Sequence, residues 1–457
     1  KIDVGYLKSK MKETKGRIQE LTNDLKNSKE CQPFYQEMRK KYGAKINLGS
    51  HAQVGQVLFG VMKHPGAVLT KSGRFVTDRN VMQDVNVPFV RTFVQVQKLK
   101  KAYSTYLKGI LREVDADGFI HPIYNLHTAR TYRSSVDHPP TQQIPVRDEE
   151  VAAIVRPCFI PRKSSGQIGE YDFSGIEVKV SACYHKDPVF LNYVRDPTTD
   201  MHGDMCRPIY RLSDSEMTPT KDDKEDAKRI KDIRYNVKNK FVFPEFYGDW
   251  FVSCAKALWF AIDRMHLHTR NGLDLKDHLR KKGIRELGNV VMEKCRIIEG
   301  PHSHTFMKHL QEVEKDFWGK RFKVYSQWKW DWFEHYLEHG YFDTYTGFRC
   351  SGVMDKKQAV NYPIQGSAFH CLLWCLIRIQ KLLHKYKMRT LVIGQIHDSL
   401  LADIAKGELN HYLEIAHHVM TVELLMHWKW IIVPMECEAE VAPPGESWFK
   451  KMKVTVN

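Results

Sequence analysis

Apolar residues recur every three or four positions over most of this 457-residue chain, which is the spacing of amphipathic helices. The pattern predicts helices over residues 1–45, 86–112, 365–386 and most of 249–345, with hairpin strands and loops over 113–160. The first helical segment carries Leu7, Met11, Ile18, Leu21 and Leu25 at near-helical spacing. The larger part of the molecule is therefore expected to be helical.

Runs with the character of strands are fewer. Residues 168–184 predict a strand, a turn and a helix, and Ser174 with Glu177 has the S-x-x-E spacing of a capping box at the start of that helix. Residues 391–396 and 400–404 are apolar runs joined by a short turn, which is the pattern of a hairpin. Helices mixed with antiparallel strands place the chain in the α+β class.

Each of these strand-like regions carries an aspartate. Asp172 ends the first strand, and Asp398 lies in the turn of the hairpin, more than 200 residues later. A predicted helix between them carries cations three and four positions apart, and Pro244 is expected to end it. The positions of this stripe are Lys224, Lys228, Lys231, Arg234 or Tyr235, and Lys238. Two carboxylates can hold a pair of divalent ions and a cationic helix face stabilises a polyphosphate, so the set indicates chemistry on a nucleoside triphosphate.

The overall charge supports a polyanionic partner. Lys and Arg exceed Asp and Glu by 70 to 54, which gives a net charge of +16 and a pI near 9.2. Such a surplus suits nucleic acid, because each neutralised phosphate releases counterions, although it would also serve solubility. No apolar run approaches the roughly eighteen residues of a membrane span. The ten cysteines form no C-x-x-C pair, which argues against a zinc module or a disulfide framework and for a reducing, intracellular compartment.

Three motifs, in this order, resemble those of the DNA polymerase I-like family, the family A DNA polymerases. They are Tyr171-Asp172-Phe173-Ser174-Gly175-Ile176-Glu177, the stretch from Arg234 to Gly248, and His397-Asp398. The resemblance extends over essentially the whole chain and implies a right-hand fold, with an antiparallel-sheet palm, helical fingers and a helical thumb. The implied domains are a thumb over 1–125, a palm over 126–212 and 346–457, and fingers over 213–345 with an insertion near 255–300.

The resemblance also implies a role for each motif residue. Asp172, Asp398 and the backbone carbonyl of Phe173 would bind two Mg²⁺ ions, with Mn²⁺ as a substitute. Lys238 would be the general acid, and Glu177 the gate that excludes a ribose 2′-hydroxyl. The dNTP would contact Arg234, Lys238, Phe243, Tyr247, His202 and Glu177, whereas the DNA would contact Arg133, Gln142, Asn361, Gln365 and His397.

The implied activity is template-directed addition of deoxynucleotides to a primer 3′-hydroxyl by a two-metal mechanism. Primer–template DNA and dNTPs would be the partners, and a separate exonuclease, sliding factor or helicase would be candidate helpers. The chain begins where the thumb of such a polymerase begins, so no proofreading exonuclease is expected in it. A monomer in the cytoplasm of a bacterium or of a phage-infected cell, without membrane contact, fits a replicase of phage type.

The chain departs from the family pattern at three places. One extra residue lies between Lys238 and Tyr247, so the register of the cationic helix against the motif stays open. The alternatives are Lys240 in place of Lys238, and Val242 or Phe241 in place of Phe243. Ser399 stands where many relatives have a glutamate, and Tyr132 stands where they have a glycine.

Other functions fit parts of the pattern. A single-subunit RNA polymerase shares the motif order, but a gate at Glu177 would be out of place in it. A catalytically silent DNA-binding scaffold would keep the basic surface without needing both aspartates. The run from His335 to His339 has the H-x-x-E-H spacing of a zinc protease, with His302, His304 or His309 as a third ligand, and an amphipathic packing helix explains it equally well. No G-x-x-x-x-G-K-[ST] loop occurs, which makes a P-loop ATPase unsuitable.

Overall fold

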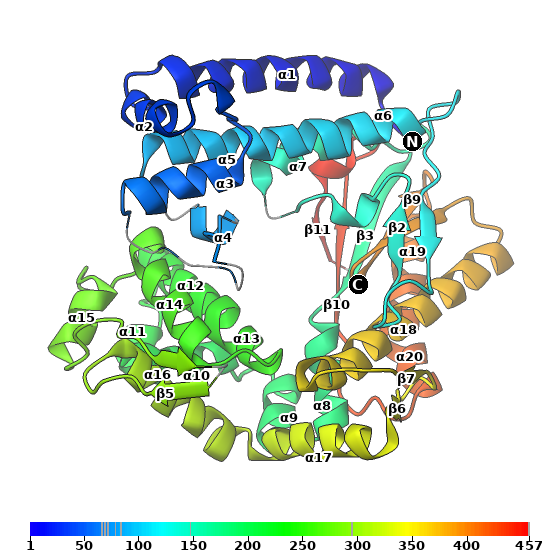
Figure 1. Ribbon diagram of the computed structural model, residues 1–457. Coiled ribbons are helices and arrows are strands. Elements are labelled where there is room, and N and C mark those ends of the chain that lie inside the picture. Colours follow the sequence, from blue (N-terminus) through cyan, green and yellow to red (C-terminus); the bar gives the residue numbers. More distant parts are fainter. Residues whose placement is uncertain are drawn as a thin grey trace.

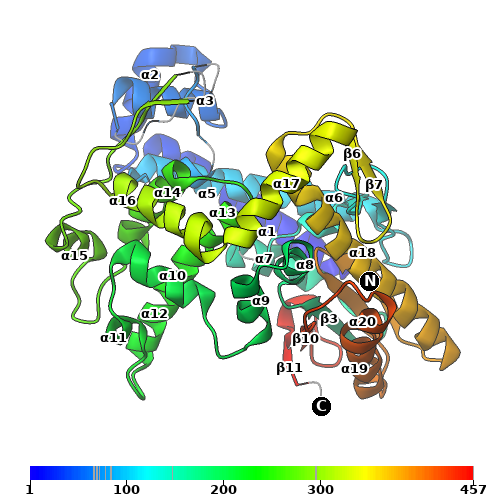
Figure 2. The ribbon, with the colours of Figure 1, turned by 90° about the horizontal axis from the view of Figure 1, so that it is seen from below.

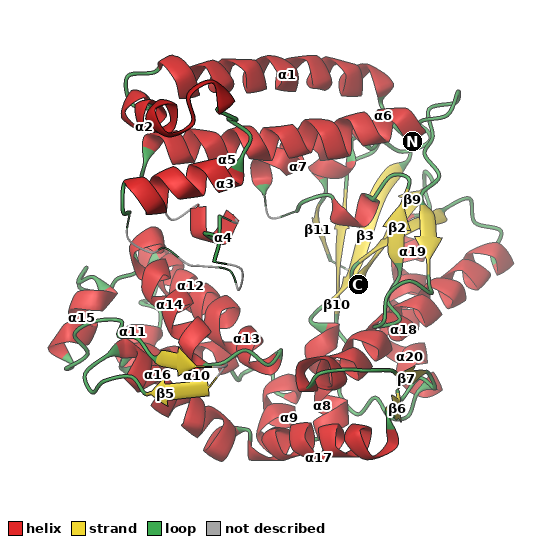
Figure 3. Ribbon diagram, viewed as in Figure 1, coloured by secondary structure: helices red, strands yellow, loops and turns green. Residues whose placement is uncertain are grey.

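The computed structural model describes residues 1–64, 67, 70, 73–77, 79–82, 85–146, 148–293 and 296–455. Within this part of the chain, an N-terminal helical lobe, a five-stranded sheet with its helices and a second helical lobe are arranged around the middle of the molecule (Figure 1). Helices dominate, and the longest strands belong to the one sheet (Figure 3). The predicted α+β class is therefore confirmed.

The N-terminal lobe is built on two long helices that lie side by side. Helix α1 (Val4–Asn27) packs along α5 (Pro88–Lys101), which continues through the π-helical turn η3 (Ala102–Leu107) into α6 (Lys108–Glu113). The shorter helices are α2 (Gln32–Tyr42), α3 (His51–Gly55), η2 (Gln56–Val61) and α4 (Arg79–Met82). The helices predicted within residues 1–45 and 86–112 are confirmed.

Residues 113–160 only partly match their prediction. The expected hairpin forms from β1 (Ile123–Asn125) and β2 (Ser135–Asp137), which pair antiparallel. However, α7 (Glu149–Val155) is a helix that the prediction missed. Its start is fixed by Asp148, whose side chain accepts a hydrogen bond from the backbone N–H of Val151.

The central sheet has the strand order β11-β10-β3-β9-β8, and every neighbouring pair is antiparallel. Its strands are β3 (Gln167–Phe173), β8 (Leu391–Ile396), β9 (Ser399–Ile404), β10 (Cys437–Val441) and β11 (Met452–Val454). The predicted hairpin of β8 and β9 is confirmed. Around the sheet lie α8 (Ile176–His185), α18 (Lys356–Lys385), α19 (Leu409–His418), η8 (Val419–Glu423) and α20 (Leu424–His427).

Helix α18 begins nine residues earlier than the predicted helix over 365–386. Its start is a capping box, in which Asp355 accepts from the N–H of Gln358 and the Gln358 side chain accepts from the N–H of Asp355. Pro363 lies inside the helix without ending it. The prediction missed these first turns because Pro363 and Gly366 are residues that usually interrupt a helix.

The second helical lobe follows α9 (Pro188–Arg195) and contains a long, nearly continuous helical path. The lobe comprises α10 (Met201–Tyr210), α11 (Asp214–Met217), α12 (Lys224–Val237), η6 (Lys238–Val242), α13 (Phe243–Phe246), α14 (Phe251–Met265), α15 (Leu275–Lys281), α16 (Phe306–Asp316) and η7 (Phe317–Arg321). The strands β4 (Val291–Glu293) and β5 (Arg296–Glu299) form a hairpin that the helical prediction for 249–345 missed. Helix α17 (Lys323–His339) then crosses from this lobe toward the hairpin of β6 (Tyr341–Asp343) and β7 (Arg349–Ser351) (Figure 2).

The hydrophobic core shows which parts of the molecule are packed as one unit. A single buried cluster runs from the sheet, through Phe173 and Leu400, to Phe246 in the second lobe. The N-terminal lobe has its own cluster, which includes Leu7 and Phe89. The nine cysteines in the described part of the chain are free. None of the described helices is both long and apolar enough to cross a membrane.

Candidate active site

The two aspartates are brought together by the pairing of β3 with the β8–β9 hairpin. Asp172, near the end of β3, lies opposite Ser399, the first residue of β9. Beside it, the backbone N–H of Phe173 donates to the carbonyl oxygen of Asp398 at 3.2 Å. Both aspartates line a cavity of about 930 Å³. The pairing of β3 with β9 thus brings together two aspartates that are more than 200 residues apart in sequence.

The surroundings of Asp172 and Asp398 disfavour a negative charge on both carboxyl groups at once. Burial raises the pKa of Asp172 to about 7, and repulsion from Asp398 adds to the effect. Burial also raises the pKa of Asp398, against the opposing influence of Arg133 and His397. Carboxylate oxygens are the ligands that Mg²⁺ prefers, and a divalent cation would relieve this repulsion. The donor set therefore fits a hard divalent cation.

The described residues contain no group of three His, Cys, Asp or Glu side chains that could hold a metal ion. Metal binding would accordingly depend on the Asp172–Asp398 pair together with backbone or substrate oxygens. On the H-x-x-E-H helix, His335 and His339 stack on each other, with ring centroids 4.2 Å apart. Of the nominated third ligands, His309 lies on α16, where its Nε2 contacts the carbonyl of Pro208. The zinc-protease alternative gains no support from this arrangement.

Glu177 does not form the predicted capping box. Helix α8 begins after Gly175, which has φ 66°, and no side chain caps it. The carboxylate of Glu177 instead pairs with Arg133 and accepts from the Tyr247 hydroxyl at 2.6 Å. The capping-box prediction was wrong because these two distant partners hold the carboxylate that local spacing assigned to the helix start. Glu177 consequently connects α8 with the segment that carries Arg133 and with the end of α13, and it lines the same cavity as the aspartates.

The extra residue of the cationic helix is absorbed by a π-helical turn. Within η6, the backbone N–H of Phe243 donates to the carbonyl of Lys238, five residues earlier. A π turn is the way in which an α-helix takes up one inserted residue. Lys238 Nζ then lies 5.1 Å from the centroid of the Phe243 ring, whereas Phe241 and Val242 are fully buried in the core. The geometry thus favours Lys238 and Phe243 as the residues that face the site.

Pro244 does not end this helical path, contrary to the prediction. It occupies the first turn of α13, which continues to Phe246 before Gly248 turns away with φ 84°. Proline is tolerated there because its missing N–H falls at the start of a helical segment. The continued path carries Tyr247 to Glu177.

A second set of predicted residues gathers around His202 on α10. The Arg234 guanidinium donates to the Asp200 carboxylate at 2.7 Å, and the His202 ring packs edge-on against Phe243 with centroids 5.7 Å apart. Burial, aided by Lys238, lowers the pKa of His202 to about 4. Among the described residues, His202 Nδ1 and Arg234 Nε are buried without a hydrogen-bond partner. Buried polar atoms without partners are unfavourable, so these atoms point to a ligand.

The predicted DNA contacts are divided between the cavity of the aspartates and the end of α13. Gln142 Nε2 donates to Gln395 Oε1 at 2.7 Å, and the Gln395 side chain reaches the carbonyl of His397. Asn361 Nδ2 donates to the carbonyl of Tyr247 at 3.1 Å. Asp172, Asp398, Glu177, Arg133, Gln142 and His397 all line the one cavity. Gln365, one turn beyond Asn361 on α18, is half-buried and outside that lining.

Close packing against α18 fixes the segment that carries Arg133. A Cβ on Gly366 would lie 2.7 Å from the carbonyl oxygen of Thr131, so a larger residue would displace this segment. Tyr132 has φ 57°, a conformation that favours glycine, and its ring lies 5.2 Å from that of Phe348.

Sequence reasoning missed the acids of β10. Glu438 is the direct cross-strand neighbour of Asp172, on the side opposite Ser399, and it also lines the cavity. Lys453 Nζ lies 2.6 Å from the Glu438 carboxylate. The signal was the alternation of Glu436, Glu438 and Glu440, because residues two apart on a strand share a face.

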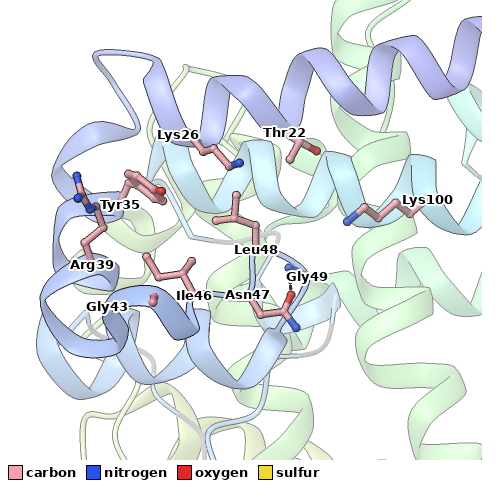
Figure 4. A pocket seen from close by; sticks show the side chains of 11 residues that line it. Thr22, Lys26, Tyr35, Arg39, Gly43, Ile46, Asn47, Leu48, Gly49 and Lys100 are labelled. Atoms are coloured by element: carbon pink, nitrogen blue, oxygen red, sulfur yellow. Dashed lines mark hydrogen bonds between the residues drawn. The ribbon is translucent and has the colours of Figure 1, made fainter.

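A basic cavity of about 560 Å³ lies in the N-terminal lobe, between α1, α2, α5 and the segment before α3 (Figure 4). Lys26, Arg39 and Lys100 contribute the charged side chains of its lining, and no acidic residue is among the lining residues. The arrangement suits an anion such as a phosphate.

Comparison with known proteins gives one consistent result. The model of DNA polymerase family A matches residues 15–237 and 320–450, which is most of the chain. The DNA polymerase of Bacillus phage SP01 is 24% identical over 416 residues, which are 85% of this chain and 39% of that protein. DNA polymerase I of Lactococcus lactis subsp. lactis (strain IL1403) is 24% identical over 433 residues, 93% of this chain and 42% of that protein.

A solved structure also matches. The POL domain of Pol1 from M. smegmatis, in complex with DNA primer-template and dNTP, superposes with a TM-score of 0.70 at 20% identity, covering 97% of this chain and 67% of that one. The chain spans about two fifths of the length of the curated relatives it matches.

Proposed function

The chain belongs to DNA polymerase family A and has its right-hand fold, with an antiparallel-sheet palm, helical fingers and a helical thumb; from this premise we propose that it is a template-directed DNA polymerase. It would add deoxynucleotides from dNTPs to a primer 3′-hydroxyl. The observation that carries the proposal is the meeting of Asp172 and Asp398 in one cavity, which Glu177 also lines. The domain ranges 1–125, 126–212, 213–345 and 346–457 remain predictions.

Polymerases of this family use divalent metals. Here Asp172, Asp398 and the Phe173 carbonyl would hold two Mg²⁺ ions, or Mn²⁺, which when bound lower the pKa of the attacking hydroxyl and neutralise the leaving group. Arg234, Lys238 and His202 would bind the triphosphate. The orphaned nitrogens of Arg234 and His202 support this role, because phosphate oxygens would supply the missing acceptors. Lys238 would then donate a proton to the pyrophosphate as it leaves.

Selection of a deoxyribose would depend on Glu177. Its carboxylate is fixed by Arg133 and by the hydroxyl of Tyr247, so it cannot easily swing aside to admit a 2′-hydroxyl. Phe243 would lie over the incoming sugar and base, and Tyr247 at the template position. This fixed gate argues for a DNA polymerase over a single-subunit RNA polymerase.

The DNA would lie along the surface that joins the palm to the thumb. Arg133, Gln142, Asn361, Gln365 and His397 are the proposed contacts near the primer terminus. The basic cavity of the thumb, lined by Lys26, Arg39 and Lys100, suits a backbone phosphate farther along the duplex. A monomer is sufficient for this arrangement, and an exonuclease, sliding factor or helicase would act as a separate partner.

The proposal is tested by extension of a labelled primer on defined templates in Mg²⁺, with dNTPs or with rNTPs. We expect templated extension with dNTPs only, and a Glu177→Ala variant should begin to accept rNTPs. Extension with rNTPs alone would favour the RNA polymerase. A folded protein that binds primer–template and extends it with neither substrate would favour the silent scaffold.

A further inference from the structure

A buried polar cluster lies behind the helix that carries Phe243 and Tyr247. Its members, which we name the Glu245 cluster, are Glu245, Cys254, Glu314, Trp318 and Lys329. Glu245 is 1% exposed. Its carboxyl accepts from Trp318 Nε1 at 2.9 Å, lies 3.6 Å from Cys254 Sγ, and is within hydrogen-bonding reach of the Glu314 carboxyl. The Glu245 carboxyl group is thus shielded from water and surrounded by polar side chains.

The Glu245 cluster connects α13 to four other helical elements. Glu245 belongs to α13, Cys254 to α14, Glu314 to α16, Trp318 to η7 and Lys329 to α17. Glu314 also accepts from the backbone N–H of Phe251, the first residue of α14, at 2.7 Å. Glu245 itself is two residues from Phe243 and two from Tyr247. Any shift of this side chain must therefore move the residues that face the nucleotide.

Most of the cluster lies outside the residues that the family model matches. The family model leaves residues 238–319 unmatched, and four of the five members lie in that segment, although Glu245 falls within the motif from Arg234 to Gly248. Lys329 is the exception. The family match therefore assigns no role to these four residues.

Charge balance in the cluster calls for one proton on the two carboxyl groups. Lys329 Nζ lies 3.1 Å from the centroid of the Trp318 ring, and its positive charge acts on both Glu245 and Glu314. One ammonium and two carboxyl groups are neutral together only if the carboxyl groups share one proton, and a net buried charge is unfavourable. The other titratable or charged groups that face the cluster are Asp249, His185, Lys356 and Tyr325, whose ring centroid lies 5.6 Å from Lys329 Nζ.

This balance applies below the pKa of Lys329, because burial favours the uncharged form of each group in the cluster. Burial, with repulsion from Glu314, raises the pKa of Glu245, and burial likewise raises the pKa of Glu314. Burial lowers the pKa of Lys329 to about 7, and it lowers the pKa of His185 to about 3, which keeps that ring neutral.

We propose that Glu245 and Glu314 share a single proton and form a positioning site, which holds α13 so that Phe243 and Tyr247 are placed for the incoming nucleotide. The role rests on the proposed polymerase function. Loss of the proton at high pH would set two like charges side by side behind α13 and would weaken dNTP binding. Asp172 and Asp398, which belong to the sheet, would stay in place.

The first test measures the shared proton without DNA or nucleotide. A carboxyl group whose folded pKa is raised gives stability that is present below its unfolded pKa and is lost as the pH rises through the folded pKa. The melting temperature of the wild type should therefore fall as the pH rises from about 5 to about 10. Glu245→Gln keeps an acceptor for Trp318 but cannot titrate, so its curve should be flatter. Glu312→Gln, which removes an exposed acid from the same helix as Glu314, should follow the wild type.

The second test measures positioning by single-turnover incorporation on a primer–template. In the wild type, KM for dNTP should rise by about tenfold per pH unit above the pKa of the pair, as expected for loss of one proton, with kcat much less affected. Glu245→Gln should lack this rise, and Glu312→Gln should retain it.

The two readouts separate the possible failures. Parallel melting curves for the wild type and Glu245→Gln would overturn the shared proton. A flattened melting curve with an unchanged KM profile would overturn the positioning role. A folded wild type that incorporates no nucleotide would remove the proposed function, and with it the positioning role, while the melting curves would still report on the proton.

Discussion

Hydrogen bonding between antiparallel strands fixes the positions of Asp172 and Asp398. The positions of Lys238 and Phe243 instead depend on how many residues make up each turn of a helix. In the palm, antiparallel pairing sets Asp172 against Ser399 and leaves no freedom of register, because a slip of one residue would turn every side chain to the other face. In the fingers, one additional residue is taken up by the π turn η6, and Phe243 still meets Lys238.

This difference bears on how each region can take up an inserted residue. The family model matches up to residue 237 and again from residue 320, so it covers both aspartates but stops immediately before Lys238. An insertion in a paired strand would shift the register of the ladder, while a helix can accept one residue in a π turn and keep the residues on either side in place. The two halves of the site are joined by the hydrogen bond between Tyr247 and Glu177.

The largest effect is expected in the palm. Asp398→Asn should lower kcat by on the order of a thousandfold, because a lost metal ligand removes several kcal/mol of transition-state stabilisation. Primer–template affinity, measured by fluorescence anisotropy, should remain close to that of the wild type. Asp316→Asn, in an exposed i,i+4 pair with Lys320, serves as the control and should extend primers normally.

The fingers should show a smaller loss. Lys238→Met is expected to reduce the single-turnover rate by about a hundredfold, as is typical for removal of a general acid. Lys231→Met removes an exposed cation from α12 and should have little effect. Equal losses in the two variants would show that the helix acts only through its total charge.

The packing of α18 against the segment that carries Arg133 can be tested at Gly366. A methyl group there must displace the carbonyl of Thr131, so Gly366→Ala should destabilise the protein by roughly 1–3 kcal/mol in urea unfolding. The segment with Arg133 should shift as well, which would weaken primer binding. Gly109→Ala, in α6 with open space around it, should be neutral or stabilising.

Metal binding in the palm should depend on pH. The folded pKa of Asp172 is raised to about 7, so its protonated form adds stability at low pH that is lost as the pH rises through 7. A metal ion must displace this proton, and its affinity should rise by about tenfold per pH unit below that pKa. Calorimetric titration with Mn²⁺ at several pH values measures the slope. In Asp172→Asn, weak binding with a shallower dependence on pH is expected, because only Asp398 remains to titrate.

The smallest effect should follow from removing the extra residue of the fingers helix. Deletion of Asn239, inside the π turn, should convert η6 to α-helix and change KM for dNTP by less than about tenfold, or 1.4 kcal/mol. Deletion of Tyr235, within regular α12, changes the phase of Arg234 against Lys238 and should be far more harmful. If both deletions were equally harmful, the account of the π turn would be wrong.

The sequence predicted those parts of the site that depend on local pattern. Short apolar runs bounded by turns located β3 and the β8–β9 hairpin, and so located Asp172 and Asp398. The partners of Glu177 could not be found this way, because Arg133 and Tyr247 lie 44 and 70 residues away and meet it only in the folded chain.

Other misses have the same origin. The capping box at Ser174 was a correct local pattern that tertiary contacts replaced. A proline usually ends a helix, but Pro244 follows the π turn η6 and occupies the first turn of α13. The Glu245 cluster left no signal at all, since Glu245, Glu314 and Lys329 are far apart in sequence and resemble ordinary surface charges.

The most direct test is the structure of the ternary complex with a primer ending in a dideoxynucleotide, its template, a matching dNTP and Mg²⁺. The account predicts metal ions held by both Asp172 and Asp398, with the triphosphate on Arg234 and Lys238 and the sugar beside Glu177. A triphosphate bound away from Lys238, or metal ions that leave either aspartate uncoordinated, would contradict it.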